Sequence, residues 1–301
     1  MRITDNMVSS SLLAQIQQLT TQQSQLQSEV GSGLAVTQPS DSPAVFGQVI
    51  ELQSQSQEET QFGNNASQAL DTANASYSGL QSLQSIYDRA VQLGTLGGNG
   101  ATGATSQASY ADELDQLIQQ TVQVANSQLG SQYLYGGTAV SSPPFTAATD
   151  STGTITGVTY VGNSAQAPVP ISATASVSPA TSGTTNAGIA TFINSMISLR
   201  DALNSGDATA ISTANTSLAN SEDTITGAVA ENGAVQARIQ SVQTQQQSNT
   251  TELNTLIGND TNANLPSTIV ELNQAQLAYQ AALQSSASIM HVSILNYLTL
   301  D

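Results

Sequence analysis

Apolar and polar residues alternate in steps of three and four along the last part of the sequence, residues 266–297. Pro266, Ser267 and Glu271 at its start are residue types that favour a first helical turn. No glycine or second proline interrupts the run. Such spacing gathers side chains on one face of a helix, as in a coiled coil. The pattern predicts a long amphipathic helix that needs a partner, with one face formed by Ile269, Leu272, Gln276, Tyr279, Leu283, Ser286, Met290, Ser293 and Tyr297.

The same spacing occurs near the start of the sequence, where Gly31 and Gly33 end it. We therefore predict that an N-terminal coiled-coil segment, residues 1–35, pairs with a C-terminal coiled-coil helix, residues 265–301. A two-helix hairpin that closes a globular core would give the same pattern, so the pairing alone does not decide the function. The N-terminal positions on the predicted contact face are Leu12, Ile16, Leu19, Gln23, Leu26 and Val30.

Helical periodicity also dominates the middle of the chain. Residues 36–139 read as the first part of a helical rod, interrupted by a glycine-rich turn at residues 94–103. Residues 188–264 read as its second part, with one unbroken apolar pattern from Ile211 to Leu256. The predicted fold is mainly α, a long antiparallel coiled-coil rod with paired N- and C-terminal helices.

Between these two parts, the composition of residues 140–187 changes to Ser, Thr, Gly, Pro and β-branched residues. Short apolar runs lie on both sides of Gly157, and residues 171–177 alternate between apolar and polar. This pattern favours a small β-rich insertion domain. A disordered surface tract is the alternative interpretation of the same composition.

Charge excludes several partners. Only 8% of the 301 residues are charged, the formal net charge is −17, and the sequence has no cysteine. Because no basic patch can form, we expect no nucleic acid and no anionic membrane as a partner. No apolar segment is long enough for a membrane span, and the N-terminus lacks the apolar core of a cleaved signal peptide. The basic residues are Arg2, Arg89, Arg200 and Arg238.

No residue pattern predicts an enzyme. His291 is the only histidine, so neither a zinc site nor a Ser–His–Asp arrangement is available. Asp112, Glu113 and Asp115 form the densest acidic cluster, but helical spacing places them on different faces. The glycines at residues 97–100 have no lysine beside them and do not form a phosphate-binding loop. We expect no catalytic residue, no metal and no cofactor.

Short motifs at both ends resemble one family. Met1-Arg2-Ile3-Thr4, Ser32-Gly33-Leu34-Ala35-Val36 and Pro39-Ser40-Asp41-Ser42-Pro43-Ala44 are similar to the flagellin superfamily, and most closely to its hook–filament junction proteins (hook-associated protein 3). Ala278-Tyr279-Gln280-Ala281-Ala282-Leu283-Gln284 and Ser293-Ile294-Leu295-Asn296-Tyr297-Leu298 resemble the C-terminal signature of that family. The resemblance covers the helical segments at both ends of the chain. The sequence departs from the family where relatives often carry basic residues, at Leu34, Ala35 and Ser288.

This resemblance implies a structural component of the bacterial flagellum that connects hook to filament by self-assembly. It implies four kinds of partner: further copies in a ring, a neighbouring hook-associated protein, flagellin, and an export chaperone bound to the C-terminal helix. It also implies an extracellular location on the flagellum, reached through the flagellar export apparatus without a cleaved signal peptide. The residues that we expect at the assembly interface are Leu12, Ile16, Leu19, Leu26, Val30, Ile269, Leu272, Tyr279, Leu283, Met290, Ile294 and Tyr297.

Three alternative functions remain open from the sequence. A flagellin filament subunit would share the helical ends. A secreted adhesin or effector would act through the β-rich insertion. A hydrolase within the insertion would need a catalytic set, which the sequence does not offer.

Overall fold

The computed structural model describes residues 5–298, and it describes no side chain at residues 5, 6, 8, 9 and 289–298. Its described part is mainly helical with short antiparallel strand pairs, which confirms the predicted fold class at this level. The elements are α1 Asp5–Ser32, α2 Pro43–Gly97, α3 Ala104–Ala125, β1 Gln128–Leu129, β2 Gln132–Tyr133, β3 Phe145–Thr149, β4 Ile155–Tyr160, β5 Val169–Pro170, β6 Ser176–Val177, α4 Gly183–Ser205, α5 Ala208–Ala219, α6 Glu222–Thr261 and α7 Leu265–Leu298.

The chain divides into two compact units, which are described separately here. The first unit comprises Met1–Gln57 with Thr250–Asp301, and the second comprises Glu58–Asn249. Helices α2 and α6 therefore contribute residues to both units. These bounds differ from the five segments expected from the sequence, and the strands of residues 140–187 belong to the second unit.

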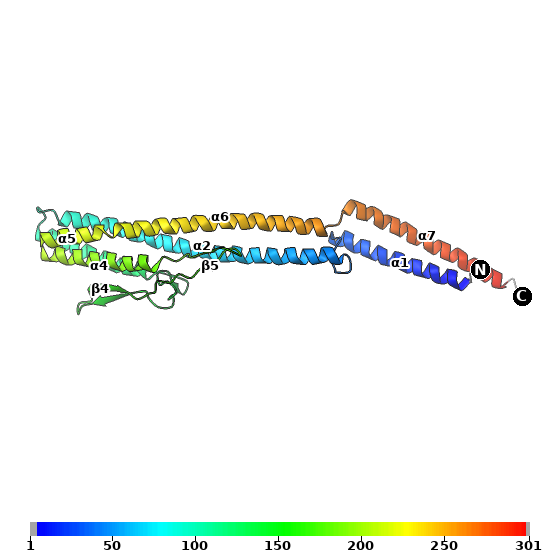
Figure 1. The fold of residues 1–301 in the computed structure, drawn as a ribbon, viewed down its shortest axis with the longest axis horizontal. Coiled ribbons are helices and arrows are strands. Elements are labelled where there is room, and N and C mark those ends of the chain that lie inside the picture. Colours follow the sequence, from blue (N-terminus) through cyan, green and yellow to red (C-terminus); the bar gives the residue numbers. More distant parts are fainter. Residues whose placement is uncertain (1–4, 299–301) are drawn as a thin grey trace. The chain divides into compact units, whose positions relative to one another are not determined.

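In the first unit, α1 lies beside α7 and runs in the opposite direction (Figure 1). Helix α1 ends where the backbone enters the left-handed region at Gly33, with φ of 75°, a conformation that glycine adopts without steric cost. The N–H of Gly33 donates to the carbonyl oxygen of Glu29 over 2.8 Å and closes the last turn. The pairing of the N- and C-terminal helices is thus as the heptad-like spacing predicted.

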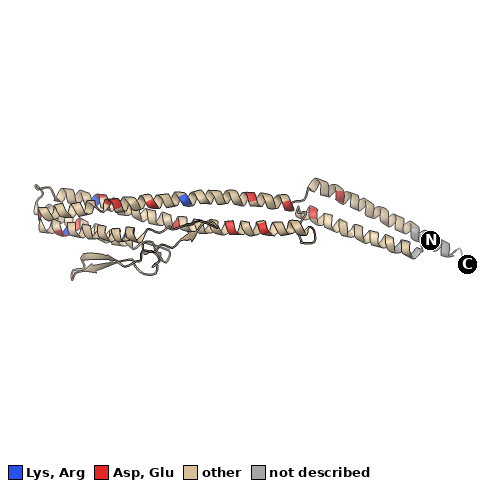
Figure 2. Ribbon diagram, in the orientation of Figure 1, with Lys and Arg blue, Asp and Glu red and all other residues tan. Residues whose placement is uncertain are grey.

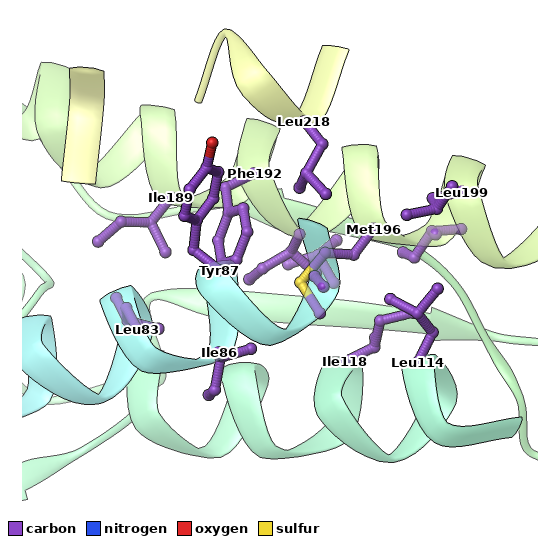
Figure 3. Close-up of a cluster of buried hydrophobic side chains, with 14 of the residues drawn as sticks. Leu83, Ile86, Tyr87, Leu114, Ile118, Ile189, Phe192, Met196, Leu199 and Leu218 are labelled. Atoms are coloured by element: carbon purple, nitrogen blue, oxygen red, sulfur yellow. The ribbon is translucent and has the colours of Figure 1, made fainter. Parts of the chain in front are cut away.

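The main core lies in the second unit, where α2, α3, α4 and α5 meet. Side chains from all four helices point toward one another in this cluster (Figure 3). Phe192 and Met196 of α4 are fully buried and lie at its centre, and the ring of Tyr87 from α2 packs against Phe192 with ring centroids 6.0 Å apart. The remaining labelled members of the cluster are Leu83, Ile86, Leu114, Ile118, Ile189, Leu199 and Leu218.

The longest strand pair joins this core. Strands β3 and β4 pair antiparallel, and Phe145, Ile155 and Val158 are buried against the helices. The Asn194 amide of α4 accepts from the N–H of Val158 and donates to its carbonyl oxygen, each over 2.9 Å. Strand β4 runs through Gly157 without a break, so the short apolar runs on both sides of that glycine belong to one strand. The partner strand is β3, which contains Phe145.

A second short segment, residues 169–177, crosses α2 and α6 and is called the strap here. Its strands β5 and β6 pair with each other, and Ile171 between them is fully buried. The Asn65 side chain of α2 donates to the carbonyl oxygen of Pro170 over 3.0 Å. Ile171 and Val177 of the strap form a separate small core with Ala66, Ala69, Ala73 and Ile239.

The apolar pattern from Ile211 to Leu256 is divided between two helices. Helix α5 ends at Ala219 and α6 begins at Glu222, so two helices carry the unbroken apolar pattern. Glu222 and Asp223 lie in the first turn of α6, where negative charge is favoured by the helix dipole. The apolar spacing continues across the break because Leu218 and Ile225 both face the core. Periodicity alone therefore did not reveal the break.

Candidate assembly surface

The contact face between α1 and α7 follows the predicted spacing on the α1 side. Leu26 is buried, with 6% of its surface exposed, and the other predicted α1 positions are half-buried. On α7, Leu272 and Tyr279 are half-buried as predicted. These residues of the two predicted faces are therefore brought together in one chain. The half-buried α1 positions are Leu12, Ile16, Leu19, Gln23 and Val30.

Two predicted positions on α7 do not face α1. Ile269 is 46% exposed and Leu283 is 43% exposed, so their assignment to the contact with α1 is wrong. The positions that turn inward are Thr268, Leu272, Ala275, Gln276, Tyr279, Ala282 and Ser286. The small side chains of Ala275 and Ala282 at this face allow a close approach of the helices, and the larger neighbours lie to the side. Met290, Ile294 and Tyr297 lie outside the side chains that the structure describes.

The first unit exposes most of the large apolar side chains that face water. Of the twelve large hydrophobic residues in the described part of the chain that are strongly exposed, nine belong to this unit. Five of them lie on α7, and Leu277 has 67% of its surface exposed. Contiguous exposed apolar surface is typical of an interaction site, and Val270 and Leu277 share one side of α7. The nine are Met7, Leu13, Ile50, Leu256, Leu265, Ile269, Val270, Leu277 and Leu283.

Sequence reasoning missed Val270, Leu277 and Leu13 as surface positions. Val270 and Leu277 are seven residues apart, so they share one side of α7. That repeat was present in the sequence, but it was hidden by the stronger repeat that contains Leu272 and Tyr279. The alanines at 275 and 282 show the same seven-residue spacing and identify the inward face.

Backbone hydrogen bonds join the two chain segments at the base of the helix pair. The N–H of Ala35 donates to the carbonyl oxygen of Thr261 over 2.7 Å, and the N–H of Ala263 donates to that of Gly33 over 2.9 Å. Leu34 and Asn262 form an isolated antiparallel bridge between these bonds. Helix α1 therefore ends, and α7 begins, close to one backbone bridge between the two chain segments.

The turn that follows α1 is organised by one carboxylate. Asp41 accepts hydrogen bonds from the backbone N–H groups of Thr37 and Gln38 and from both side chains. The Thr37 N–H contributes most, and together these donors hold the pKa of Asp41 below its ordinary value. The motif Pro39-Ser40-Asp41-Ser42-Pro43 thus forms the turn that leads into α2.

Charged residues are sparse on the helix pair. In residues 10–32 of α1 and 265–288 of α7, the only charged residues are Glu29 and Glu271. Red and blue are correspondingly rare on these two helices (Figure 2). In the second unit, Arg89 pairs with Glu113 over 2.6 Å, and the buried Arg200 pairs with Asp115 over 2.9 Å and also with Asp201. Within residues 5–298, Arg238 has no ion pair. The surface of the α1–α7 pair is therefore nearly uncharged and partly apolar.

Neither a metal site nor a membrane span emerges from the described residues. No group of three or more His, Cys, Asp or Glu side chains comes together there. No helix in the same part of the chain is long and apolar enough to cross a membrane. Hydroxyl and amide side chains line a groove between α4, α5 and α6, and none of them is paired as a nucleophile and base.

Comparison with known proteins gives the family context. Residues 3–138 match the family model for the bacterial flagellin N-terminal helical region. A protein from Vibrio parahaemolyticus described as a flagellar hook-associated protein shares 15% identity at a TM-score of 0.66, covering 74% of this chain and 100% of its own. FlgL from Bacillus cereus shares 18% identity at a TM-score of 0.60, covering 69% of this chain and 98% of its own.

FlgL from Xanthomonas campestris shares 15% identity at a TM-score of 0.55, covering 67% of this chain and 97% of its own. The comparison with curated protein sequences gave no match. At these identities, the likeness to solved structures establishes a shared fold. The family model and the fold together confirm the resemblance to the flagellin superfamily. Residues 3–138 are therefore similar to the N-terminal helical region of the bacterial flagellins, and the chain shares its fold with FlgL structures.

Proposed function

We propose that this chain is a structural component of the bacterial flagellum that connects hook to filament, and that it assembles through α1 and α7. One observation carries the proposal: the helix pair exposes large apolar side chains while carrying almost no charge. The flagellin-type region and the fold of the hook-associated proteins support the flagellar setting.

The energetics of the pair favour assembly. Burying one Leu, Ile or Val side chain contributes about 1.5–3 kcal/mol relative to leaving it in water. The exposed α7 residues Leu265, Ile269, Val270, Leu277 and Leu283 therefore offer several such contributions to each neighbouring copy. Within the chain, in contrast, the α1–α7 contact buries few large side chains, so the pair gains stability when other copies cover it. Ile269 and Leu283 thus stay in the proposed interface, in contact with neighbours in place of α1.

The same surface defines the proposed partners. Further copies of the chain form a ring, and a hook-associated protein and flagellin lie on its two sides. An export chaperone covers the apolar side of α7 before assembly. The mature protein is extracellular, on the flagellum, and reaches it without a cleaved signal peptide. No enzymatic step belongs to this function.

Deletion of the gene in its flagellated host tests the junction role. We expect cells that build hooks but release flagellin into the medium, because the filament subunits have no surface on the hook to which they can attach. Immunoelectron microscopy of wild-type flagella should place the protein at the boundary between hook and filament. Normal filaments in the deletion strain would overturn the proposal.

A filament subunit is the main alternative. Purified subunits added to filament seeds distinguish the two functions. A junction protein is expected to add a short cap and stop, whereas long filaments grown from this chain would identify it as a flagellin.

A further inference from the structure

The sequence contains two Asn-Gly pairs, Asn99-Gly100 and Asn232-Gly233. Asparagine followed by glycine is prone to a self-reaction, in which the backbone nitrogen of the glycine attacks the side-chain amide carbon. Glycine favours this step because it has no Cβ to block the approach and its backbone rotates freely. The surrounding structure then decides whether a given pair can react.

Asn99-Gly100 lies in an exposed turn between α2 and α3. The N–H of Ala101 donates to Asn99 Oδ1 over 3.2 Å, which folds the side-chain amide over the Gly100 peptide and polarises its carbonyl. The N–H of Thr102 donates to the Asn99 carbonyl oxygen over 2.8 Å and closes the turn. An added Cβ at Gly100 would meet nothing within 4 Å. The turn therefore has room to rearrange around the Asn99 side chain.

Asn232-Gly233 has the opposite environment. It lies inside α6, and Asn232 is only 4% exposed. Gln236 Nε2 donates to Asn232 Oδ1 over 2.8 Å and fixes the amide against the helix. Helical geometry commits the Gly233 N–H to a carbonyl one turn earlier and directs it along the helix axis, away from its own preceding side chain. This pair is a built-in control for the first.

We propose that Asn99 is a site of spontaneous covalent modification, and that Asn232 is protected by the fold. In the first step, the Gly100 nitrogen loses its proton and bonds to Asn99 Cγ. The Cγ–Nδ2 bond breaks, and ammonia leaves with that proton. The resulting five-membered succinimide is then opened by one water molecule. Opening at one carbonyl gives aspartate, and opening at the other gives isoaspartate, whose backbone contains one additional methylene.

The modification changes the turn without reaching the α1–α7 contact. It adds a carboxylate two residues after the end of α2, where negative charge is disfavoured by the helix dipole. Isoaspartate also lengthens the backbone between Asn99 and Thr102, which alters the turn that Thr102 holds through its hydroxyl bond to Leu96. The site thus accumulates a negative charge with time in a chain that already has a formal charge of −17.

Peptide mapping by mass spectrometry tests the proposal on the full-length chain. Folded protein is incubated in mildly alkaline buffer and digested, and the loss of the amide is followed at both Asn-Gly pairs. We expect conversion at Asn99 into a mixture of isoaspartate and aspartate, while Asn232 stays intact. In denaturant, the two pairs should convert at similar rates. The variant Gly100→Ala should retain its Asn99 amide under the same conditions.

Two results would overturn the proposal. One is an intact Asn99 in folded protein that converts normally in denaturant. The other is equal conversion of Asn99 and Asn232 in folded protein, because the fold would then not select between them. Circular dichroism before and after incubation verifies that the protein remained folded.

Discussion

Gln246 of α6 donates through Nε2 to the main-chain carbonyl oxygen of Ile171 over 2.6 Å, although the two residues are 75 positions apart. This bond holds the strap to α6, while Asn65 holds it to α2. The Ile171 side chain fills the small core beneath. The strap therefore belongs to the folded second unit and contributes to its stability.

Shortening the strap's central side chain should weaken the second unit. Ile171 is fully buried, so Ile171→Ala removes apolar contacts and leaves a cavity. We expect a loss of about 2–4 kcal/mol in the free energy of unfolding. Urea denaturation followed by circular dichroism measures it. Val161→Ala is the matched control, because Val161 is 54% exposed and its truncation should change stability by less than about 0.5 kcal/mol.

Arg200 should contribute more to the stability of the second unit than Arg238. Its guanidinium is buried and donates to Asp115, Asp201 and the carbonyl oxygen of Ile155. Arg200→Ala removes these bonds and leaves Asp115 without its buried ion-pair partner, at an expected cost of about 2–3 kcal/mol. Arg238→Ala, on an exposed face of α6, is the control and should lie within about 0.5 kcal/mol of wild type. Equal effects of the two substitutions in urea denaturation would contradict this prediction.

Two leucines on α7 should separate folding from assembly. Leu283 is exposed in the single chain, so Leu283→Asp should leave the melting curve unchanged and abolish assembly. Leu272 faces α1, and Leu272→Asp should also loosen the helix pair, because a carboxylate without a partner in a packed interface costs several kcal/mol. Circular dichroism melting of purified subunits measures the effect of each substitution on folding.

Motility and flagellin leakage report assembly of the same two variants, and the amount of each variant in the medium verifies its export. Wild-type motility of the exported Leu283→Asp variant would mean that this side of α7 stays in water in the assembled structure.

Acid should remove the contribution of one surface ion pair. The hydrogen bond from Arg89 lowers the pKa of Glu113 in the folded state. The pair's contribution is therefore complete above the unfolded pKa of Glu113 and is lost as the pH falls through the lower folded value. Because the side chains of Arg89 and Glu113 are 45% and 40% exposed, solvent screening keeps this contribution small. Glu113→Gln should thus destabilise the protein slightly at neutral pH and not at all in strong acid. A difference that grows in acid would have the wrong sign.

Much of the helical architecture could be predicted from periodicity. The α1 face from Leu12 to Val30 was correct because the large apolar residues and the contact face coincide there. On α7 they do not coincide: alanines occupy the contact face while Ile269 and Leu283 lie outside it. A prediction from hydrophobic spacing gives most weight to large apolar side chains, so it placed Ile269 and Leu283 on the contact face. Close packing of two helices depended on the smaller ones.

The strands were harder to predict because long-range contacts define them. Asn194 of α4 and Arg200 supply hydrogen bonds to β4 across many residues of intervening chain. Ile171 is buried only because α2 brings three alanines and α6 brings Ile239 beneath it. None of these long-range contacts produces a local pattern in the amino-acid sequence. The exposed apolar side of α7 left a pattern, the repeat of Val270 and Leu277, but a stronger repeat obscured it.

The single bridge between Leu34 and Asn262 sets the rotational phase of both terminal helices. One residue inserted between this bridge and α1 would turn the rest of that helix by about 100°. Its leucines would then face water, and its Ser and Gln side chains would meet α7. An insertion of about one full turn would restore the angle. The contact face between α1 and α7 therefore depends on the number of residues between each helix and this bridge, as well as on the amino-acid composition of the helices.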